Sequence, residues 1–269
     1  LGAQAYERLL ATRVTFLNAP ESEHALEDRQ QADAERATHH FLAIEQHGLL
    51  DWPGNSARLA WLHWLQGDTN AALARSQSAI ERAELAGQMH QLRAQIMSAR
   101  GEVAAAISEW QLAINAQPEA ADAYLALGLY HANAGDLDSA RQVFESGVAA
   151  LPQSVELRYN AGLARAMSGD VAGARAAFER ALELDPRHLP SRENLAGLLA
   201  SQGEFAASVG QFRIAAEQSP EDAGTQLMLA RALLGMGDRD AAAKALAEAL
   251  RLAPDDPEAL ALRAELARE

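Results

Sequence analysis

The sequence predicts an all-α solenoid, in which helix-turn-helix repeats stack into one elongated array. The first observation is a ladder of prolines spaced thirty-four residues apart: Pro118, Pro152, Pro186, Pro220 and Pro254. The second is a ladder of glycines with the same spacing: Gly67, Gly101, Gly135, Gly169, Gly203 and Gly237. The third is composition, because 49% of the residues are hydrophobic and 5% aromatic, as expected of helices that pack through small and straight-chain side chains. A self-similar period of this length indicates one repeat array.

Residues 1–52 do not keep this period, and we interpret them as an N-terminal helical cap region. Residues 3–17 carry apolar side chains at helical spacing, which predicts a short amphipathic helix that ends before Pro20. Residues 21–46 favour a second helix, polar at first and apolar near Phe41. We expect three tryptophans to seal these helices against the first repeat: Trp52, Trp61 and Trp64.

Six repeat units are predicted for residues 53–256, counted back from each proline. Their ranges are 53–86, 87–120, 121–154, 155–188, 189–222 and 223–256. Residues 257–269 follow as a single C-terminal capping helix. The array is therefore expected to form one domain with an irregular N-terminal end.

Each unit carries its own signals for where helices end and begin. The glycine fits the left-handed backbone position after a first helix, because glycine enters that region without a steric penalty. The next residue is acidic every time, as Asp68, Glu102, Asp136, Asp170, Glu204 or Asp238. A carboxylate there can cap the second helix or complement its positive end, and a cap is worth about 0.5 to 2 kcal/mol. The proline lacks an N–H and restricts the residue before it, so it closes the second helix.

Side-chain size repeats along the second helices as well. Five residues after the glycine stands a small residue: Ala72, Ala106, Ala140, Ala174, Ser208 and Ala242. Seven residues further on stands another: Ala79, Ala113, Gly147, Ala181, Ala215 and Ala249. A bulky residue lies between them in five units, as Trp110, Phe144, Phe178, Phe212 or Leu246, and Ser76 takes its place in the first. Small side chains let helix axes approach, and the bulky one fills the space between adjacent helices.

This pattern resembles the tetratricopeptide repeat, a helix-turn-helix unit of the same length. In the third unit the resemblance rests on Leu127, Gly128, Gly135, Asp136, Ala140, Phe144, Gly147 and Pro152. In the fourth it rests on Gly162, Gly169, Asp170, Ala174, Phe178, Ala181 and Pro186. The chain departs from the family at the aromatic position of the first helix, which survives as Tyr124 and is replaced by Arg158, Arg192 and Gln226.

The resemblance implies a right-handed superhelix in which first helices line a concave groove and second helices lie outside. It also implies that a peptide, helix or protein partner binds in that groove. By analogy with family positions, the groove would present Leu125, Leu129, Tyr159, Asn160, Leu163, Met167, Glu193, Asn194, Leu227, Met228 and Arg231. Such a groove is mostly apolar, and its methionines can repack around varied shapes.

Two binding modes of the family can be compared with these positions. The carboxylate clamp needs Lys, Arg and Asn together, whereas this chain has Ala57, Trp61, Leu92, Asp122 and Ala126 at the corresponding places, so we reject that mode. An asparagine ladder would hold an extended backbone by amide hydrogen bonds. Asn160 and Asn194 match two rungs of such a ladder, and Ala126 and Met228 interrupt it.

Composition excludes several other functions. The formal net charge of −14 argues against nucleic acid and favours basic or neutral partners. There are no cysteines, so no thiolate metal site or Cys nucleophile arises. His39, His40 and His47 lack the spacing of a helical metal site, and no phosphate loop or nucleophile elbow is present. We predict no enzyme activity, no cofactor and no metal, and no apolar run reaches the length of a membrane span.

We therefore expect a non-catalytic protein–protein interaction scaffold. A second interpretation is a block that assembles with itself into fibres or open arrays, because joining the two different ends of a solenoid does not close. The last helix would then offer Leu260, Leu262 and Leu266 as an end-to-end contact. A third makes the chain the repeat segment of a larger glycosyltransferase or of an envelope or secretion protein, as a start at Leu1 rather than Met permits.

Source and compartment are inferred from composition and from the first residue. Alanine-rich composition and a single lysine, Lys244, favour a GC-rich bacterium. The absence of cysteine leaves the compartment open. A start at Leu1 is compatible with a removed signal peptide, so we expect the bacterial periplasm or the cell exterior.

Overall fold

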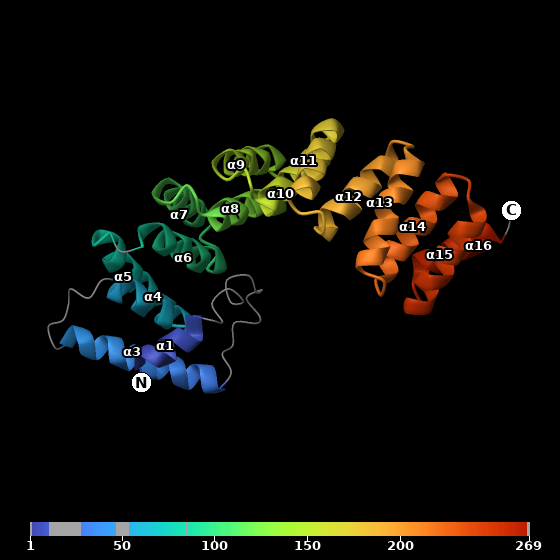
Figure 1. The fold of residues 1–269 in the computed structure, drawn as a ribbon. Coiled ribbons are helices and arrows are strands. Elements are labelled where there is room, and N and C mark those ends of the chain that lie inside the picture. The colour runs from blue at the N-terminus through green and yellow to red at the C-terminus, as the bar shows by residue number, and fades with distance from the viewer. Residues whose placement is uncertain (1, 11–27, 47–53, 84, 268–269) are drawn as a thin grey trace. The chain divides into compact units, whose positions relative to one another are not determined.

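The computed structural model describes residues 2–10, 28–46, 54–83 and 85–267, and within them it contains fifteen helices and no strand (Figure 1). The all-α solenoid predicted from the sequence is confirmed. The chain divides into two compact units, Leu1–Leu127 and Gly128–Glu269, which we call unit 1 and unit 2.

Unit 1 begins with two helices of the irregular N-terminal region. The expected helix over residues 3–17 appears as α1, Gly2–Leu10, and that over 21–46 as α3, Asp28–Gln46. The remaining parts of these expectations, residues 11–17 and 21–27, lie outside the described residues. The helices that follow are α4 (Asn55–Leu65), α5 (Thr69–Glu81), α6 (Ala86–Ala99), α7 (Val103–Ala116) and α8 (Ala121–Asn133), the last of which crosses into unit 2.

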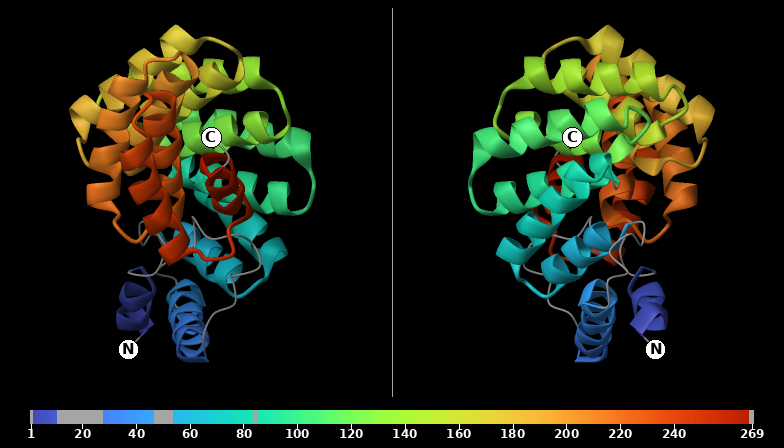
Figure 2. Two further views of the ribbon diagram at one scale, coloured as in Figure 1. Left: turned by 90° about the vertical axis from the view of Figure 1, so that its right-hand side faces the viewer. Right: turned by 90° about the vertical axis from the view of Figure 1, so that its left-hand side faces the viewer.

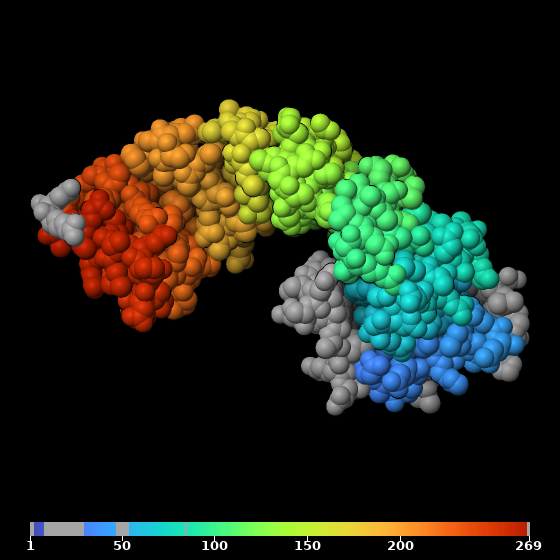
Figure 3. Space-filling model, turned by 180° about the vertical axis from the view of Figure 1, so that it is seen from behind, coloured from blue at the N-terminus to red at the C-terminus, as the bar shows by residue number. Residues whose placement is uncertain are grey.

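Unit 2 continues the alternation of first and second helices. Its helices are α9 (Leu137–Ala150), α10 (Val155–Met167), α11 (Val171–Leu184), α12 (Leu189–Ser201), α13 (Phe205–Gln218), α14 (Ala223–Gly235), α15 (Arg239–Leu252) and α16 (Pro257–Leu266). Helix α10 packs on α11, α12 on α13, and α14 on α15, and each pair also packs on the next (Figure 2). The side chains of successive helices touch along unit 2, from yellow-green to red (Figure 3).

The glycines hold the left-handed conformation expected of them. Among the six glycines the φ angle is smallest at Gly101, 73°, and largest at Gly237, 87°. The same hydrogen bond closes the turn in each repeat: the amide of the residue after the glycine donates to the carbonyl five residues earlier. At Gly135 this bond runs from the amide of Asp136 to the carbonyl of His131, at 2.9 Å. A side chain at these positions would be strained, so glycine sets the turn between the paired helices.

The acidic residues after the glycines separate into two groups. Asp68, Asp136, Asp170 and Asp238 each accept a hydrogen bond from the amide three residues on, at 2.9 to 3.2 Å. Glu102 and Glu204 make no such bond, although their backbone angles are similar. The side-chain cap is therefore present for the aspartates and absent for the two glutamates, whose additional methylene displaces the carboxylate. The glutamates still stand at the positive end of the second helix, which is the other role expected of a carboxylate there.

The prolines end the second helices as predicted. In α7, α9, α11, α13 and α15 the last helical residue lies two positions before the proline. The residue between them has left the helical region, with φ from −146° to −126°. Proline disfavours the helical conformation of the residue before it, which accounts for this boundary.

The small and bulky residues of the second helices form the core. Ala140, Ala174, Ser208 and Ala242 have no exposed surface, and Phe144 and Phe178 are 1% exposed. Gly128 and Gly162 lie against the rings of Phe144 and Phe178, where an added Cβ would come within 2.4 and 2.6 Å of a ring carbon. The bulky side chain therefore fills the space that small residues on the neighbouring helix leave.

The expectation for the tryptophans is wrong for the two that are described. The N-terminal helices are sealed against α4 by a cluster that includes Phe41, Leu59 and Leu62. Trp61 belongs to a different cluster, with Met89 and Leu92. Trp64 packs on that cluster and stands edge-on to Trp61 at 5.5 Å. Neighbouring residues of α4 point to different sides of the helix, and its two tryptophans face the helices of the following repeats. Trp52 lies outside the described residues.

Candidate functional site

The first helices of unit 2 expose three large apolar side chains at positions predicted to line the groove. Leu129 on α8 is 44% exposed, Met167 on α10 is 62% exposed and Met228 on α14 is 36% exposed. We call the surface formed by these residues with Tyr159, Asn160, Leu163 and Asn194 the first-helix face. Leu125 is half-buried on the part of α8 that belongs to unit 1.

Tyr159 and Asn194 bring neighbouring repeats together on this face. The Nδ2 of Asn194 donates to the phenol oxygen of Tyr159 at 3.4 Å and to the carbonyl of Pro190 at 2.9 Å. The Tyr159 ring packs on Phe178 at 6.0 Å and edge-on to His188 at 5.3 Å. Burial raises the pKa of Tyr159, and the hydrogen bond from Asn194 opposes this. The phenol is therefore a protonated, oriented hydrogen-bonding group at neutral pH.

The remaining predicted groove residues occupy different environments. Asn160 donates to the carbonyl of Glu156 at 2.8 Å, as Asn194 does to that of Pro190. Leu163 is half-buried and packs on the core around Phe178. Leu227 is 5% exposed and belongs to the core of α12–α16. Arg231 forms an ion pair with Glu258 at 2.8 Å.

A cavity of about 310 Å³ opens on the first-helix face between α12 and α14, and we call it the inner pocket. Its lining consists of Glu193, Asn194, Gly197, Phe212, Asp222, Gly224, Thr225 and Met228. The buried hydroxyl of Thr225 lies 2.5 Å from Oε1 of Glu193 and 2.6 Å from Oδ2 of Asp222. A hydroxyl has one proton, so it can donate to one of these carboxylates at a time.

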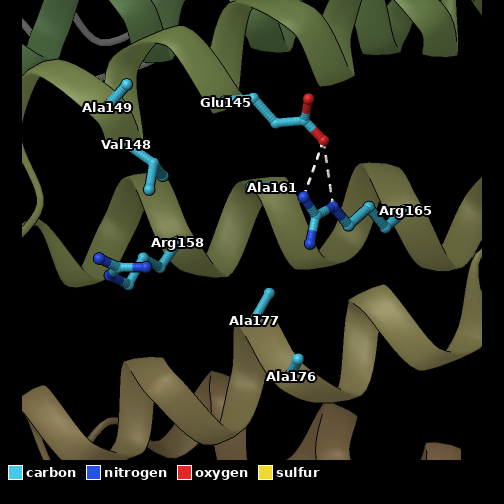
Figure 4. A pocket seen from close by; sticks show the side chains of 8 residues that line it. All are labelled: Glu145, Val148, Ala149, Arg158, Ala161, Arg165, Ala176 and Ala177. Atoms are coloured by element: carbon cyan, nitrogen blue, oxygen red, sulfur yellow. Dashed lines mark hydrogen bonds and ion pairs between the residues drawn. The ribbon is translucent and has the colours of Figure 1, made fainter.

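A second cavity, of about 400 Å³, lies between α9, α10 and α11, and we call it the outer pocket (Figure 4). It is lined by Glu145, Val148, Ala149, Arg158, Ala161, Arg165, Ala176 and Ala177. Figure 4 shows Arg158 and Arg165 on the same side of α10, with Arg165 reaching Glu145. None of these residues was predicted as a site, although the departure from the aromatic position at Arg158 was visible in the sequence.

Two of the three leucines of the last helix, Leu262 and Leu266, pack into the core of unit 2. Leu262 is 7% exposed in the core that α14 and α15 also form, and Leu266 packs on the same core. Leu260 is half-buried. The exposed positions of α16 are Pro257, Glu258, Ala261, Arg263, Ala264 and Glu265.

The two described histidines of α3 have different surroundings. His39 is exposed and His40 stacks edge-on to Phe41 at 5.3 Å, while His47 lies outside the described residues. Throughout the described part of the chain, no three His, Asp or Glu side chains gather in a group that could hold a metal ion. Among the helices described there, none is both long enough and apolar enough to cross a membrane.

Comparison with protein families gives three matches, each described as a tetratricopeptide repeat. They cover residues 99–155, 155–188 and 203–266, together more than half of the chain. The comparison with curated proteins finds no sequence match.

Comparison with solved structures finds repeat proteins of low sequence identity. The C-terminal part of a TPR repeat-containing protein from Cytophaga hutchinsonii has a TM-score of 0.69 at 18% identity, over 85% of this chain and 93% of that one. YrrB, described as a TPR protein with an unusual peptide-binding site, has a TM-score of 0.60 at 23% identity, over 70% of this chain and 97% of that one. PilF from Pseudomonas aeruginosa has a TM-score of 0.61 at 21% identity, over 78% of this chain and 96% of that one. At these identities the likeness concerns the fold.

Proposed function

Because the chain belongs to the tetratricopeptide repeat family, we propose that it is a non-catalytic scaffold whose first-helix face in unit 2 binds a segment of a partner protein. The observation that carries this proposal is the exposure of Leu129, Met167 and Met228 on first helices. Large apolar side chains that stay in water on one face are typical of an interaction surface. Methionine adapts to partners of varied shape.

The polar groups between these apolar residues support binding of a peptide rather than of a purely apolar surface. Tyr159 presents an aromatic ring with a protonated phenol, and Asn194 orients it at 3.4 Å. Rigid amphipathic side chains of this kind contribute strongly to interfaces because they lose little conformational entropy on binding. They would hydrogen-bond the partner's backbone while Met167 and Leu163 contact its apolar side chains.

The inner pocket indicates which kind of side chain the partner contributes. Glu193 and Asp222 both approach the Thr225 hydroxyl, which can satisfy one of them at a time. A Lys or Arg side chain would bring further donors to the carboxylates and lay its aliphatic stem along Met228 and Phe212. The preferred segment therefore combines apolar residues with at least one basic residue, in agreement with the net charge of −14.

The test uses random peptides displayed on phage and selected on the purified full-length chain. Peptides that bind are expected to be enriched in Lys or Arg beside apolar residues. Their binding should weaken as salt is raised from about 50 to 300 mM, roughly the range over which exposed charges become screened.

A matched pair of variants tests whether the selected peptides bind at the inner pocket. Met228→Arg adds a charge at the rim of the inner pocket, whereas Ile214→Arg adds the same charge on α13, where Ile214 is 41% exposed. The selected peptides should bind the Ile214 variant like the unmodified chain and the Met228 variant about fivefold or more weakly, since truncating or blocking a central contact typically costs more than about 1 kcal/mol. Equal binding to both variants, with circular dichroism showing both folded, would count against this face.

A further inference from the structure

Two arginines of unit 2 occupy equivalent places in consecutive repeats. Arg158 on α10 and Arg192 on α12 are thirty-four residues apart. Arg158 donates from Nε and Nη2 to the carbonyl of Pro152 at 3.1 and 2.7 Å. Arg192 donates from Nη2 to the carbonyl of Pro186. Each guanidinium therefore joins the start of a first helix to the end of the second helix before it.

The two arginines differ in what lies beside Nη1. Nη1 of Arg192 donates to Oε1 of Gln211 on α13 at 2.7 Å. The residue thirty-four positions before Gln211 is Ala177 on α11, whose side chain has no polar atom. Ala177 lines the outer pocket together with Arg158. The cavity thus lies where the neighbouring repeat places a hydrogen-bond acceptor.

Arg158 keeps one edge of its guanidinium available. Its Nε and Nη2 bond Pro152, which leaves both hydrogens of Nη1 and one of Nη2. Among the described residues no carboxylate lies within ion-pair distance of Arg158. Glu145, in the same pocket, is held by Nε and Nη2 of Arg165 at 3.1 and 2.9 Å.

The electrostatic surroundings agree with this geometry. Burial lowers the pKa of the Arg158 guanidinium, Arg180 adds to the lowering, and Glu183 opposes it. Glu183 is itself paired with Arg180 at 2.5 Å. The charge of Arg158 is therefore partly withdrawn from water without a carboxylate of its own.

From these observations we infer that the outer pocket is a binding site for a carboxylate, held in bidentate fashion by Nη1 and Nη2 of Arg158. Such a ligand supplies the acceptor that Gln211 gives to Arg192 and also the counter-charge that an amide lacks. Because Val148, Ala161 and Ala177 form aliphatic walls, the ligand carries a short apolar group next to its carboxylate. A peptide C-terminus and a small aliphatic acid share this chemistry.

This site does not depend on the first-helix face. Arg158, Ala161 and Arg165 recur at helical spacing on one side of α10, and Leu163 and Met167 fall on the other side. Ligands at the two surfaces approach α10 from opposite directions. Failure of peptide binding at Met228 would therefore leave the carboxylate site in the outer pocket unaffected. Failure of carboxylate binding at Arg158 would likewise leave the proposed function of the first-helix face unaffected.

The test follows the arginine Nε–H resonances of the full-length ¹⁵N-labelled chain by NMR during titration with N-acetyl-valine. N-acetyl-valinamide is the matched ligand, since it has the same apolar group and no carboxylate. We expect the acid to shift the Arg158 resonance with saturation and the amide to leave it unchanged. Equal shifts with both compounds would overturn the inference.

Three variants locate the site. Ala177→Gln places on α11 the side chain that Gln211 provides on α13, and Arg158→Gln removes the guanidinium. Each should weaken binding of the acid about tenfold or more, as expected for loss of a charge-assisted hydrogen-bonded pair. Arg213→Gln removes the same charge from an exposed position of α13 and should bind normally.

Ala177→Gln decides the outcome even where Arg158→Gln destabilises the fold, because it removes no native hydrogen bond. If a folded Ala177→Gln chain binds the acid like the unmodified chain, the site is elsewhere and the inference is wrong. The source of the carboxylate is read from N-acetyl-Ala-Ala-Val with a free C-terminus. Tighter binding than N-acetyl-valine assigns a peptide C-terminus, and equal binding assigns a small acid.

Discussion

Replacing Glu102 by aspartate is expected to stabilise the start of α7, although the change shortens a side chain and leaves its charge unaltered. Glu102 has φ −82° and ψ 61° and makes no side-chain cap bond. Asp170 has φ −80° and ψ 74°, and its Oδ1 accepts from the Gly173 amide at 2.9 Å. Because the two backbones are similar, an aspartate side chain in place of Glu102 would reach the equivalent amide, that of Ala105.

The size of this effect follows from the cap that is gained. A side-chain cap is worth about 1 kcal/mol, with a range of roughly 0.5 to 2. That corresponds to about a fivefold decrease in the local opening of the first turn. The reverse change, Asp170→Glu, should increase opening at Gly173 by a similar factor. Glu102→Ala is the control, because it removes a side chain that makes no cap bond.

Amide hydrogen exchange measured by NMR is the suitable assay. A repeat array does not unfold as a single two-state unit, so a global midpoint would blur a change at one junction. The Ala105 amide should exchange about five times more slowly in Glu102→Asp than in the unmodified chain. Unchanged exchange at Ala105, with the expected loss of protection at Gly173 in Asp170→Glu, would refute the equivalence of the two junctions.

Two further predictions concern unit 2. Phe178→Ala removes a ring that is 1% exposed and should cost about 3 to 5 kcal/mol, measured as loss of exchange protection in α10–α12; a cost below about 1 kcal/mol would show that the core does not depend on this ring. The pKa of Asp136 is lowered chiefly by its hydrogen bonds with Ser139, so the stability it contributes is present above the ordinary pKa and is lost as the pH falls through the lowered one. Ser139→Ala should raise the pKa of Asp136 in a carboxylate NMR titration, and an unaltered value would contradict this cause.

The fold could be predicted because the residues that end helices act locally. Gly135 sets a turn through its own backbone, and Pro152 closes α9 through the residue before it. These effects need no knowledge of distant contacts. The difference between Asp170 and Glu204 was not predicted, since it depends on whether a carboxylate oxygen reaches an amide, which charge and position do not specify.

Contacts between helices were harder to predict than the helices. Apolar spacing shows which residues of α4 avoid water, but not whether α3 or α6 covers them, and Trp61 was assigned to the wrong neighbour. Family positions led us to place Leu227 in the groove, and it lies in the core. The inner pocket depends on Thr225 meeting Glu193 across two repeats, and no pattern within one repeat specifies that contact.

The sequence contains a pattern that indicates the outer pocket. Arg158 and Arg192 both replace the aromatic residue of the family, which was noted as a departure. The informative comparison is between Ala177 and Gln211, which occupy the same repeat position one period apart. Aligning the repeats of one chain with each other would therefore have indicated where a partner is missing.

The bond from each arginine to the preceding proline carbonyl also bears on how such a chain can change in length. Deleting residues 159–192 would join Arg158 to Glu193 and preserve the bond from Arg158 to Pro152, because the deletion removes one whole period. Arg158 would then lie opposite Gln211 instead of Ala177, and the carboxylate site would be filled. Gain or loss of a single repeat can therefore switch a ligand site on or off while every helix junction keeps its chemistry.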